Sequence, residues 1–141
     1  MTPYPPSYDA RYLRGIEYFN AADYFEAHEV WEELWQECAA EPRRFYEGLI
    51  QAAVAIYHAS SGNRTGAERL SHSAWAKLSP YAPVYLGIDL AEFHRQLTTA
   101  LSGLTQPDQP LLDRTRLPHI VLAPPADVLG DEGSMLPEAN A

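Results

Sequence analysis

Two histidines and several carboxylates in the first half of the chain stand at helical spacing. His28 and Glu32 are four residues apart, and Glu47, Gln51 and His58 recur at intervals that place them on one stripe of a helix. Imidazole nitrogens and carboxylate oxygens together bind zinc, iron or manganese. One hypothesis is therefore a metal-dependent hydrolase or oxidase. Its candidate metal ligands are His28, Glu32, Glu47 and His58.

The same residues also fit a structural network without a metal. The zinc-protease motif needs a second histidine where this chain has Glu32, and the paired Glu-x-x-His motifs of di-iron bundles are not reproduced. Gln51 is a poor ligand for these metals. We therefore favour a buried polar cluster whose side chains hydrogen-bond one another, and we predict no cofactor, a divalent transition metal belonging to the alternative. The members of this predicted polar cluster are His28, Glu29, Glu32, Glu47, Gln51 and His58.

Two predicted helices, 23–38 and 42–60, position the predicted polar cluster. The first carries two tryptophans on a broad apolar arc, which makes them core anchors. The second is apolar around most of its circumference, as buried helices are, apart from one polar stripe. A buried polar group without a partner costs about 1–3 kcal/mol. We therefore expect the stripe to meet polar groups of the preceding helix, with the His28 and His58 side chains on the same face of the bundle.

Apolar residues at helical spacing predict an all-α fold, a compact bundle of about five mostly antiparallel helices with an irregular proline-rich C-terminal tail. The expected helices span 9–20, 23–38, 42–60, 64–79 and 89–103. Asp23 followed by Glu26 predicts a capping box at the start of the second. The expected organisation is an irregular segment over 1–8, a helical domain over 9–104 and a tail over 105–141. This tail is expected to be either flexible or extended along the bundle around residues 117–122.

The composition excludes several classes of partner. Nineteen acidic residues against ten basic ones give a formal charge of −9, and the chain has no basic patch, so we expect no binding to nucleic acid or to anionic membrane surfaces. No apolar run approaches the roughly 20 residues of a membrane span, and residues 1–6 lack the features of a secretion signal. The single cysteine, Cys38, offers neither an internal disulfide nor a zinc site. We expect an acidic, soluble, cytoplasmic domain that associates with a protein partner or with copies of itself.

Four stretches of the chain form a recognisable set of motifs. They are YFEAHEVWEELW over residues 24–35, RFYEGLIQAA over residues 44–53, the pair Tyr57-His58 and the pair Gly66-Ala67. Together they resemble the family catalogued as domain of unknown function 309, small all-helical proteins of bacteria and archaea. The resemblance extends over about residues 10–103 and leaves the tail outside. It implies a compact helical bundle and no activity, because the family is named for lacking one.

The sequence leaves two classes of function open. The favoured one is a non-catalytic module that either has a structural role or binds a protein or peptide, in a groove between helices or at an aromatic loop. That loop contains Tyr81, Tyr85 and Leu86, and its tyrosines are side chains common among interface anchors. The second class is the metal-dependent enzyme, which an open pocket reaching the predicted polar cluster would favour. Three histidines stand isolated and are given no role: His72, His94 and His119.

Overall fold

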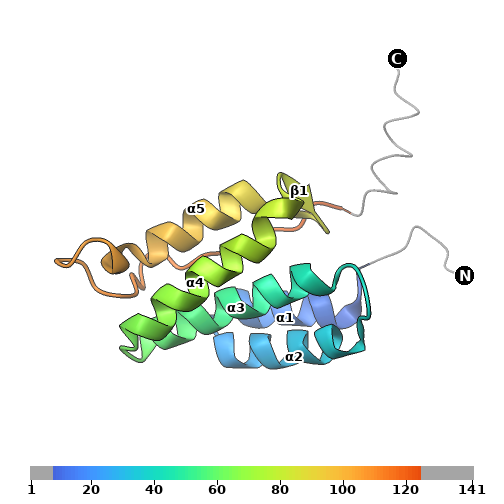
Figure 1. The fold of residues 1–141 in the computed structure, drawn as a ribbon, viewed down its shortest axis with the longest axis horizontal. Helices are drawn as coiled ribbons and strands as arrows, with labels where there is room; N and C mark the ends of the chain where they lie inside the picture. Colours follow the sequence, from blue (N-terminus) through green and yellow to red (C-terminus); the bar gives the residue numbers. More distant parts are fainter. Residues whose placement is uncertain (1–7, 125–141) are drawn as a thin grey trace, which may run out of the picture.

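The five helices that the apolar periodicity predicts are present in the computed structural model, which describes residues 8–124 (Figure 1). They are α1 (Ala10–Asn20), α2 (Tyr24–Glu37), α3 (Arg43–Ser60), α4 (Arg64–Leu78) and α5 (Leu90–Ala100). Two 3-10 turns, η1 (Ser79–Tyr81) and η2 (Ser102–Leu104), follow α4 and α5, and a short antiparallel hairpin of β1 (Val84–Tyr85) and β2 (Ile88–Asp89) precedes α5. The all-α fold class is confirmed, although the hairpin was not predicted. The tail beyond residue 124 and nearly all of the predicted 1–8 segment lie outside the described residues.

Side-chain caps begin three of the five helices. Asp9, Asn63 and Asp89 each accept a hydrogen bond from a backbone N–H of the first turn, at 2.8–3.0 Å. Each bond satisfies a donor that the start of a helix leaves without an internal partner. The capping box predicted at Asp23 and Glu26 is wrong, because the Asp23 side chain makes no capping hydrogen bond.

The space between α1, α2 and α3 is filled by large aromatic side chains. Trp31 is fully buried, and its indole N–H donates to the carbonyl oxygen of Tyr12 at 3.2 Å. Gly15 lies directly against this ring, since a Cβ atom there would fall 2.0 Å from the indole nitrogen. Trp31 is thus the core anchor that the sequence predicts. Trp35 is only half-buried and lies under the guanidinium of Arg43, 4.0 Å from its ring centroid.

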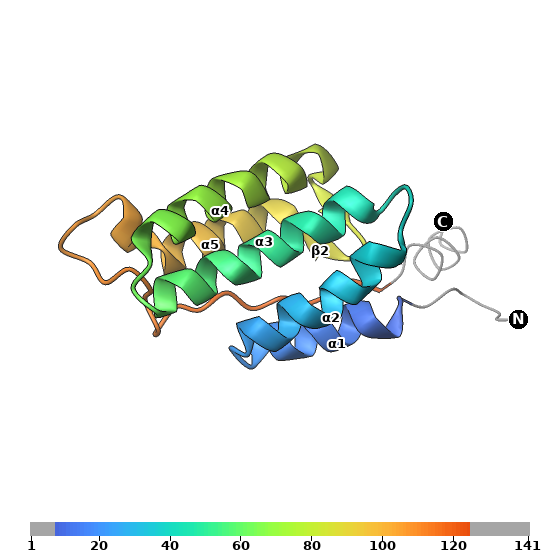
Figure 2. The same ribbon diagram turned by 60° about the horizontal axis from the view of Figure 1, so that its bottom comes forward.

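Helix α3 is buried on most of its circumference, and small residues let α4 pack closely against it (Figures 1 and 2). A Cβ atom at Gly48 of α3 would lie 2.7 Å from Cγ of Leu78, and one at Gly66 of α4 would lie 2.8 Å from the ring of His58. Within residues 8–124 the backbones of α4 and α5 do not approach each other as closely as those of α3 and α4. Neither α3 nor any other described helix is long and apolar enough to cross a membrane.

Beyond η2 the chain turns back and crosses the bundle beside α1 (Figure 2). Residues 105–124 form no helix or strand, yet Leu112 and Ile120 are buried in the core. The last helical element within residues 8–124 is η2, which ends at Leu104. The described part of the following segment belongs to the same packed unit.

Candidate functional site

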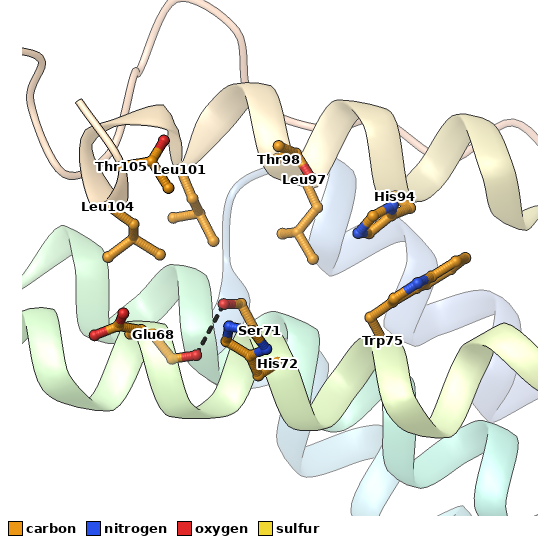
Figure 3. Close-up of a pocket in the computed structure, with 10 residues that line it drawn as sticks. All are labelled: Glu68, Ser71, His72, Trp75, His94, Leu97, Thr98, Leu101, Leu104 and Thr105. Atoms are coloured by element: carbon orange, nitrogen blue, oxygen red, sulfur yellow. Dashed lines mark hydrogen bonds between the residues drawn. The ribbon is translucent and has the colours of Figure 1, made fainter.

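A groove of about 250 Å³ lies between α4 and α5 and is closed at one end by η2 (Figure 3). Its apolar surface comes from a tryptophan of α4 and from leucines of α5 and η2, whereas hydroxyl, imidazole and carboxylate groups complete its lining. The lining residues are Glu68, Ser71, His72, Trp75, His94, Leu97, Thr98, Leu101, Leu104 and Thr105.

Helical spacing explains why these side chains meet. On α4 the lining positions are 68, 71, 72 and 75, and on α5 with its C-cap residue they are 94, 97, 98 and 101. Both sets follow the i, i+3, i+4, i+7 pattern of a single helix face. On α4 the buried residues Ala67, Ala74 and Leu78 are directed elsewhere, because α4 packs on α3. Positions 68, 71, 72 and 75 are therefore left to face α5.

Trp75 and His94 form one wall of the groove. Their rings are stacked, with centroids 4.0 Å apart and an interplanar angle of 12° (Figure 3). Burial lowers the pKa of His94 below its ordinary value, because the charged imidazolium loses hydration there. The neutral ring against the indole face gives the groove a flat, aromatic boundary at neutral pH.

The opposite end of the groove is held by Arg64, which precedes the lining residues of α4 by one turn. Its guanidinium donates hydrogen bonds to the carbonyl oxygens of Gly103 at 3.1 Å and Leu104 at 3.3 Å. These bonds tie η2 to the start of α4 and satisfy carbonyls at the end of the helical region. Leu104 is thereby fixed as the end wall.

The serine that lines the groove is not positioned as a nucleophile. Ser71, the hydroxyl nearest to a histidine in sequence, donates its hydrogen bond to the backbone carbonyl of Glu68 at 3.1 Å (Figure 3). A nucleophilic serine needs instead a hydrogen bond to a general base. An apolar surface bordered by a few hydrogen-bonding groups is typical of a site that holds a partner.

The predicted polar cluster is not assembled as expected. Glu29 is exposed and the other five members are half-buried, and no hydrogen bond or ion pair within the described range joins those of α2 to those of α3. The Nδ1 atom of His28 contacts the carbonyl oxygen of Phe25 on its own helix at 2.8 Å. The ring of His58 instead packs over Gly66 of α4, with Nδ1 3.3 Å from the amide nitrogen of Asn63.

The expectation of a buried, hydrogen-bonded cluster is therefore corrected, and its physical reason is the orientation of α3. The residues of α3 that face the bundle are apolar, so Glu47, Gln51 and His58 lie at the edge of the helix interface. Of the three, Gln51 alone places a polar atom, Oε1, out of contact with solvent and without a hydrogen-bond partner. Between residues 8 and 124 no three His, Cys, Asp or Glu side chains lie close enough together to hold a metal ion. The predicted metal ligands His28, Glu32, Glu47 and His58 therefore do not form a metal site in this structure.

The aromatic loop is also not a free surface. The rings of Tyr81 and Tyr85 pack edge-on against the buried Phe45, with centroids 5.4 and 4.8 Å away. The hydroxyl of Tyr81 donates to Glu41 at 2.5 Å, and the hydroxyl of Tyr12 donates to the carbonyl of Leu86 at 2.8 Å. Of the two predicted binding surfaces, a groove between helices and this loop, the structure contains the groove.

Sequence reasoning missed the residues of the groove because it judged His72 and His94 one by one. A usable signal was present in the i, i+3, i+4, i+7 pattern repeated in two successive helices, which carries Trp75 at the end of one set and His94 at the start of the other. The spacing between the helices, which makes that pattern a groove, depends on how α4 packs on α3.

Comparison with known proteins shows that the first half of the chain is similar to a family of uncharacterized proteins. Residues 12–70 match the model of the family described as "Domain of unknown function (DUF309)". The chain is 46% identical over 68 residues to an uncharacterized protein, YpuF, of Bacillus subtilis, a match that covers 48% of this chain and 37% of the relative. It is 30% identical over 97 residues to an uncharacterized protein of Aquifex aeolicus, covering 67% of this chain and 29% of that protein. The matches thus span only about a third of the length of these relatives.

Proposed function

We propose that the helical domain of this chain is a non-catalytic binding module. The chain belongs to the domain of unknown function 309 family, whose model matches residues 12–70. The α4–α5 groove would receive the apolar side chains of a protein segment. Because most of the groove lies beyond residue 70, the proposal concerns this chain and not the family as a whole. The occurrence of similar sequences within longer relatives supports a modular role.

The observation that carries the proposal is the open apolar groove. Soluble proteins normally bury such a surface, and apolar grooves bordered by polar groups mark binding sites. Its volume of about 250 Å³ falls below the range of about 300–1,000 Å³ that is usual for small-molecule pockets. The groove therefore suits a few side chains of a larger partner better than a whole cofactor.

The chemistry of that partner follows from shape and charge. Two neighbouring helices form a linear groove, and an amphipathic helix can enter it with anchors at i, i+3 or i+4 and i+7. The chain carries a formal charge of −9, and Glu68 contributes a carboxylate to the lining. Opposite charge attracts, so we commit to an amphipathic helix that is basic on its polar face.

A titration with a model peptide tests this assignment. The isotope-labelled full chain is mixed with a 14-residue helical peptide of leucine and lysine, and nuclear magnetic resonance spectra are recorded. Saturable shifts are expected for the Trp75 indole N–H and for the backbone amides of Leu97 and Leu101. A peptide of leucine and glutamate should bind at least tenfold more weakly.

Two phenylalanine variants on α5 provide the matched control. Thr98→Phe places a ring in the groove and should weaken binding of the basic peptide at least tenfold. Ala91→Phe adds the same ring at an exposed position outside the lining and should leave the affinity unchanged. Equal binding by both variants, or shifts confined to residues outside the groove, would show that the α4–α5 groove is not the binding site.

A further inference from the structure

The segment that crosses the bundle after η2 is held in an unusual way. Residues 117–123, which we call the strap, run in extended form beside α1 and α5 toward the β1–β2 hairpin (Figure 2). Along it, Pro118 and Ile120 are buried, whereas His119 and Val121 are exposed, Val121 by 78%. This alternation is that of a strand with one face on the protein.

One side chain, Asn20 at the end of α1, pairs with the main chain of the strap. Its amide nitrogen donates to the carbonyl oxygen of Ile120 at 2.9 Å, and its amide oxygen accepts the N–H of the same residue at 2.8 Å. Asn20 therefore does what a neighbouring strand does in a sheet. It satisfies the N–H and the carbonyl of an extended residue, and neither hydrogen bond involves that residue's side chain.

Further backbone groups of the strap are bound on either side of Ile120. Gln96 of α5 accepts the N–H of His119 at 2.8 Å. At the hairpin turn the carbonyl of Gly87 accepts the N–H of Ala123 at 2.9 Å, and the hydroxyl of Tyr8 donates to the carbonyl of Ala123 at 2.8 Å. Most of the recognition is thus directed at the peptide main chain, while Pro118 and Ile120 supply the apolar anchors.

The strap does not fill the site. A hollow of about 180 Å³ remains beside it, lined by α5, β2 and the strap itself. The lining residues are Ile88, Asp89, Glu92, Phe93, Gln96, His119, Ile120 and Val121. Its α5 residues lie on a different face of the helix from those of the α4–α5 groove. A segment with a larger side chain next to the isoleucine position would find room there.

We propose that the cleft between α1 and α5 is a recognition site for an extended apolar peptide, and that residues 117–123 are its intramolecular occupant. Recognition of extended peptides in proteins commonly combines main-chain hydrogen bonds for affinity with pockets for alternate side chains. The strap satisfies both conditions. A separate peptide with proline or a small apolar residue two positions before a β-branched one would compete with it.

The inference does not depend on the α4–α5 groove and is tested on the full chain. The probe is a capped peptide with the sequence of residues 116–124, and a second peptide with Asp at the Ile120 position is its control. The attached strap competes at a high effective concentration, so wild-type protein should bind the probe weakly. At saturating probe, hydrogen exchange at the amides of Ile120 and Ala123 should accelerate, because their partners on the protein are taken.

Two neighbouring variants sharpen the test. Ile120→Ala removes the buried anchor and should bind the probe at least tenfold more tightly than wild type. Arg116→Ala changes an exposed side chain just before the strap and should bind the probe as wild type does. Adding Asn20→Ala to Ile120→Ala should reduce the affinity at least tenfold.

Unchanged exchange of the Ile120 amide in wild type at saturating probe would overturn the proposal, whatever the stability of the variants. Equal probe affinity of Ile120→Ala and wild type would do the same. A concentration-dependent dimer of wild type that is lost in Ile120→Ala would also overturn it. The natural occupant would then be the strap of a second copy and not a separate peptide.

Discussion

The α2–α3 edge and the α4–α5 groove are both lined by side chains at helical spacing, but the helices that form them differ in how they pack. At the α2–α3 edge the helices touch, so Glu32 and Glu47 are pushed to the solvent side of a closed interface. At the groove, α4 packs closely on α3 through small residues, whereas α4 and α5 meet through large side chains such as the stacked rings of Trp75 and His94. Spacing in sequence therefore selects which residues share a face, whereas the bulk of the packed residues decides whether that face opens into a site.

The largest effect expected from this comparison contrasts two tryptophans. Trp31→Ala should lower the free energy of unfolding by about 3–5 kcal/mol, because the ring is fully buried and leaves a cavity. Trp75→Ala should cost about 1–2 kcal/mol, since its ring is partly exposed in the groove. Urea unfolding followed by circular dichroism measures both values. Equal losses would mean that the groove wall is as much a part of the core as α2 is.

The second prediction concerns the close contact between α3 and α4 at Gly48. Gly48→Ala should destabilise the fold by about 1–2 kcal/mol, because its Cβ would overlap Leu78 and overpacking outweighs the gain of about 1 kcal/mol in helix propensity. Ala76→Ser, at an exposed position of α4, is the control and should change stability by less than about 0.5 kcal/mol. A stabilised Gly48→Ala variant would show that α3 and α4 have room to separate.

A third, smaller effect concerns pH. In the folded chain burial lowers the pKa of His94, whereas in the unfolded chain this pKa is near 6.5. Between these two pKa values the unfolded state binds more protons than the folded state. The contribution of neutral His94 to the free energy of unfolding is therefore fully present above about pH 6.5 and is lost as the pH falls toward the folded pKa. His94→Gln should therefore make the urea midpoint less sensitive to pH between about 7.5 and 5.5. His72→Gln, at an exposed position of the same groove, should not.

The smallest effect is expected at the α2–α3 edge. His28→Ala should lower the free energy of unfolding by less than about 1 kcal/mol, because the ring is half-exposed. Its one hydrogen-bond partner within residues 8–124 is a backbone carbonyl of its own helix. Elemental analysis of protein purified without chelator accompanies this measurement. A stoichiometric transition metal that is lost in His28→Ala would support the metal-dependent alternative. The α2–α3 edge, and not the α4–α5 groove, would then be the functional site.

The helices could be predicted from sequence because each is encoded locally. The apolar stripe of α5, with Phe93, Leu97 and Leu101, and the caps at Asp9 and Asp89 all lie within a few residues of the structure that they determine. Such signals need no knowledge of the rest of the chain.

The sites could not be predicted in the same way because they depend on contacts between distant residues. The polar stripe of α3 was expected to meet α2, yet His58 turns to Gly66 of α4. His94 gains its environment from Trp75, on another helix, and Ile120 gains its partner from Asn20, one hundred residues earlier. In each case the deciding quantity is the relative placement of two elements, which side-chain periodicity does not specify.

The hydrogen bond between the Tyr8 hydroxyl and the Ala123 carbonyl has an architectural consequence. It brings the point where the chain enters this folded unit next to the point where it leaves. A host protein could accommodate the whole unit within one surface loop, as a lateral outgrowth, with little change to its own backbone path. Grafting residues 8–124 into such a loop of an unrelated carrier should accordingly leave the carrier's melting temperature almost unaltered.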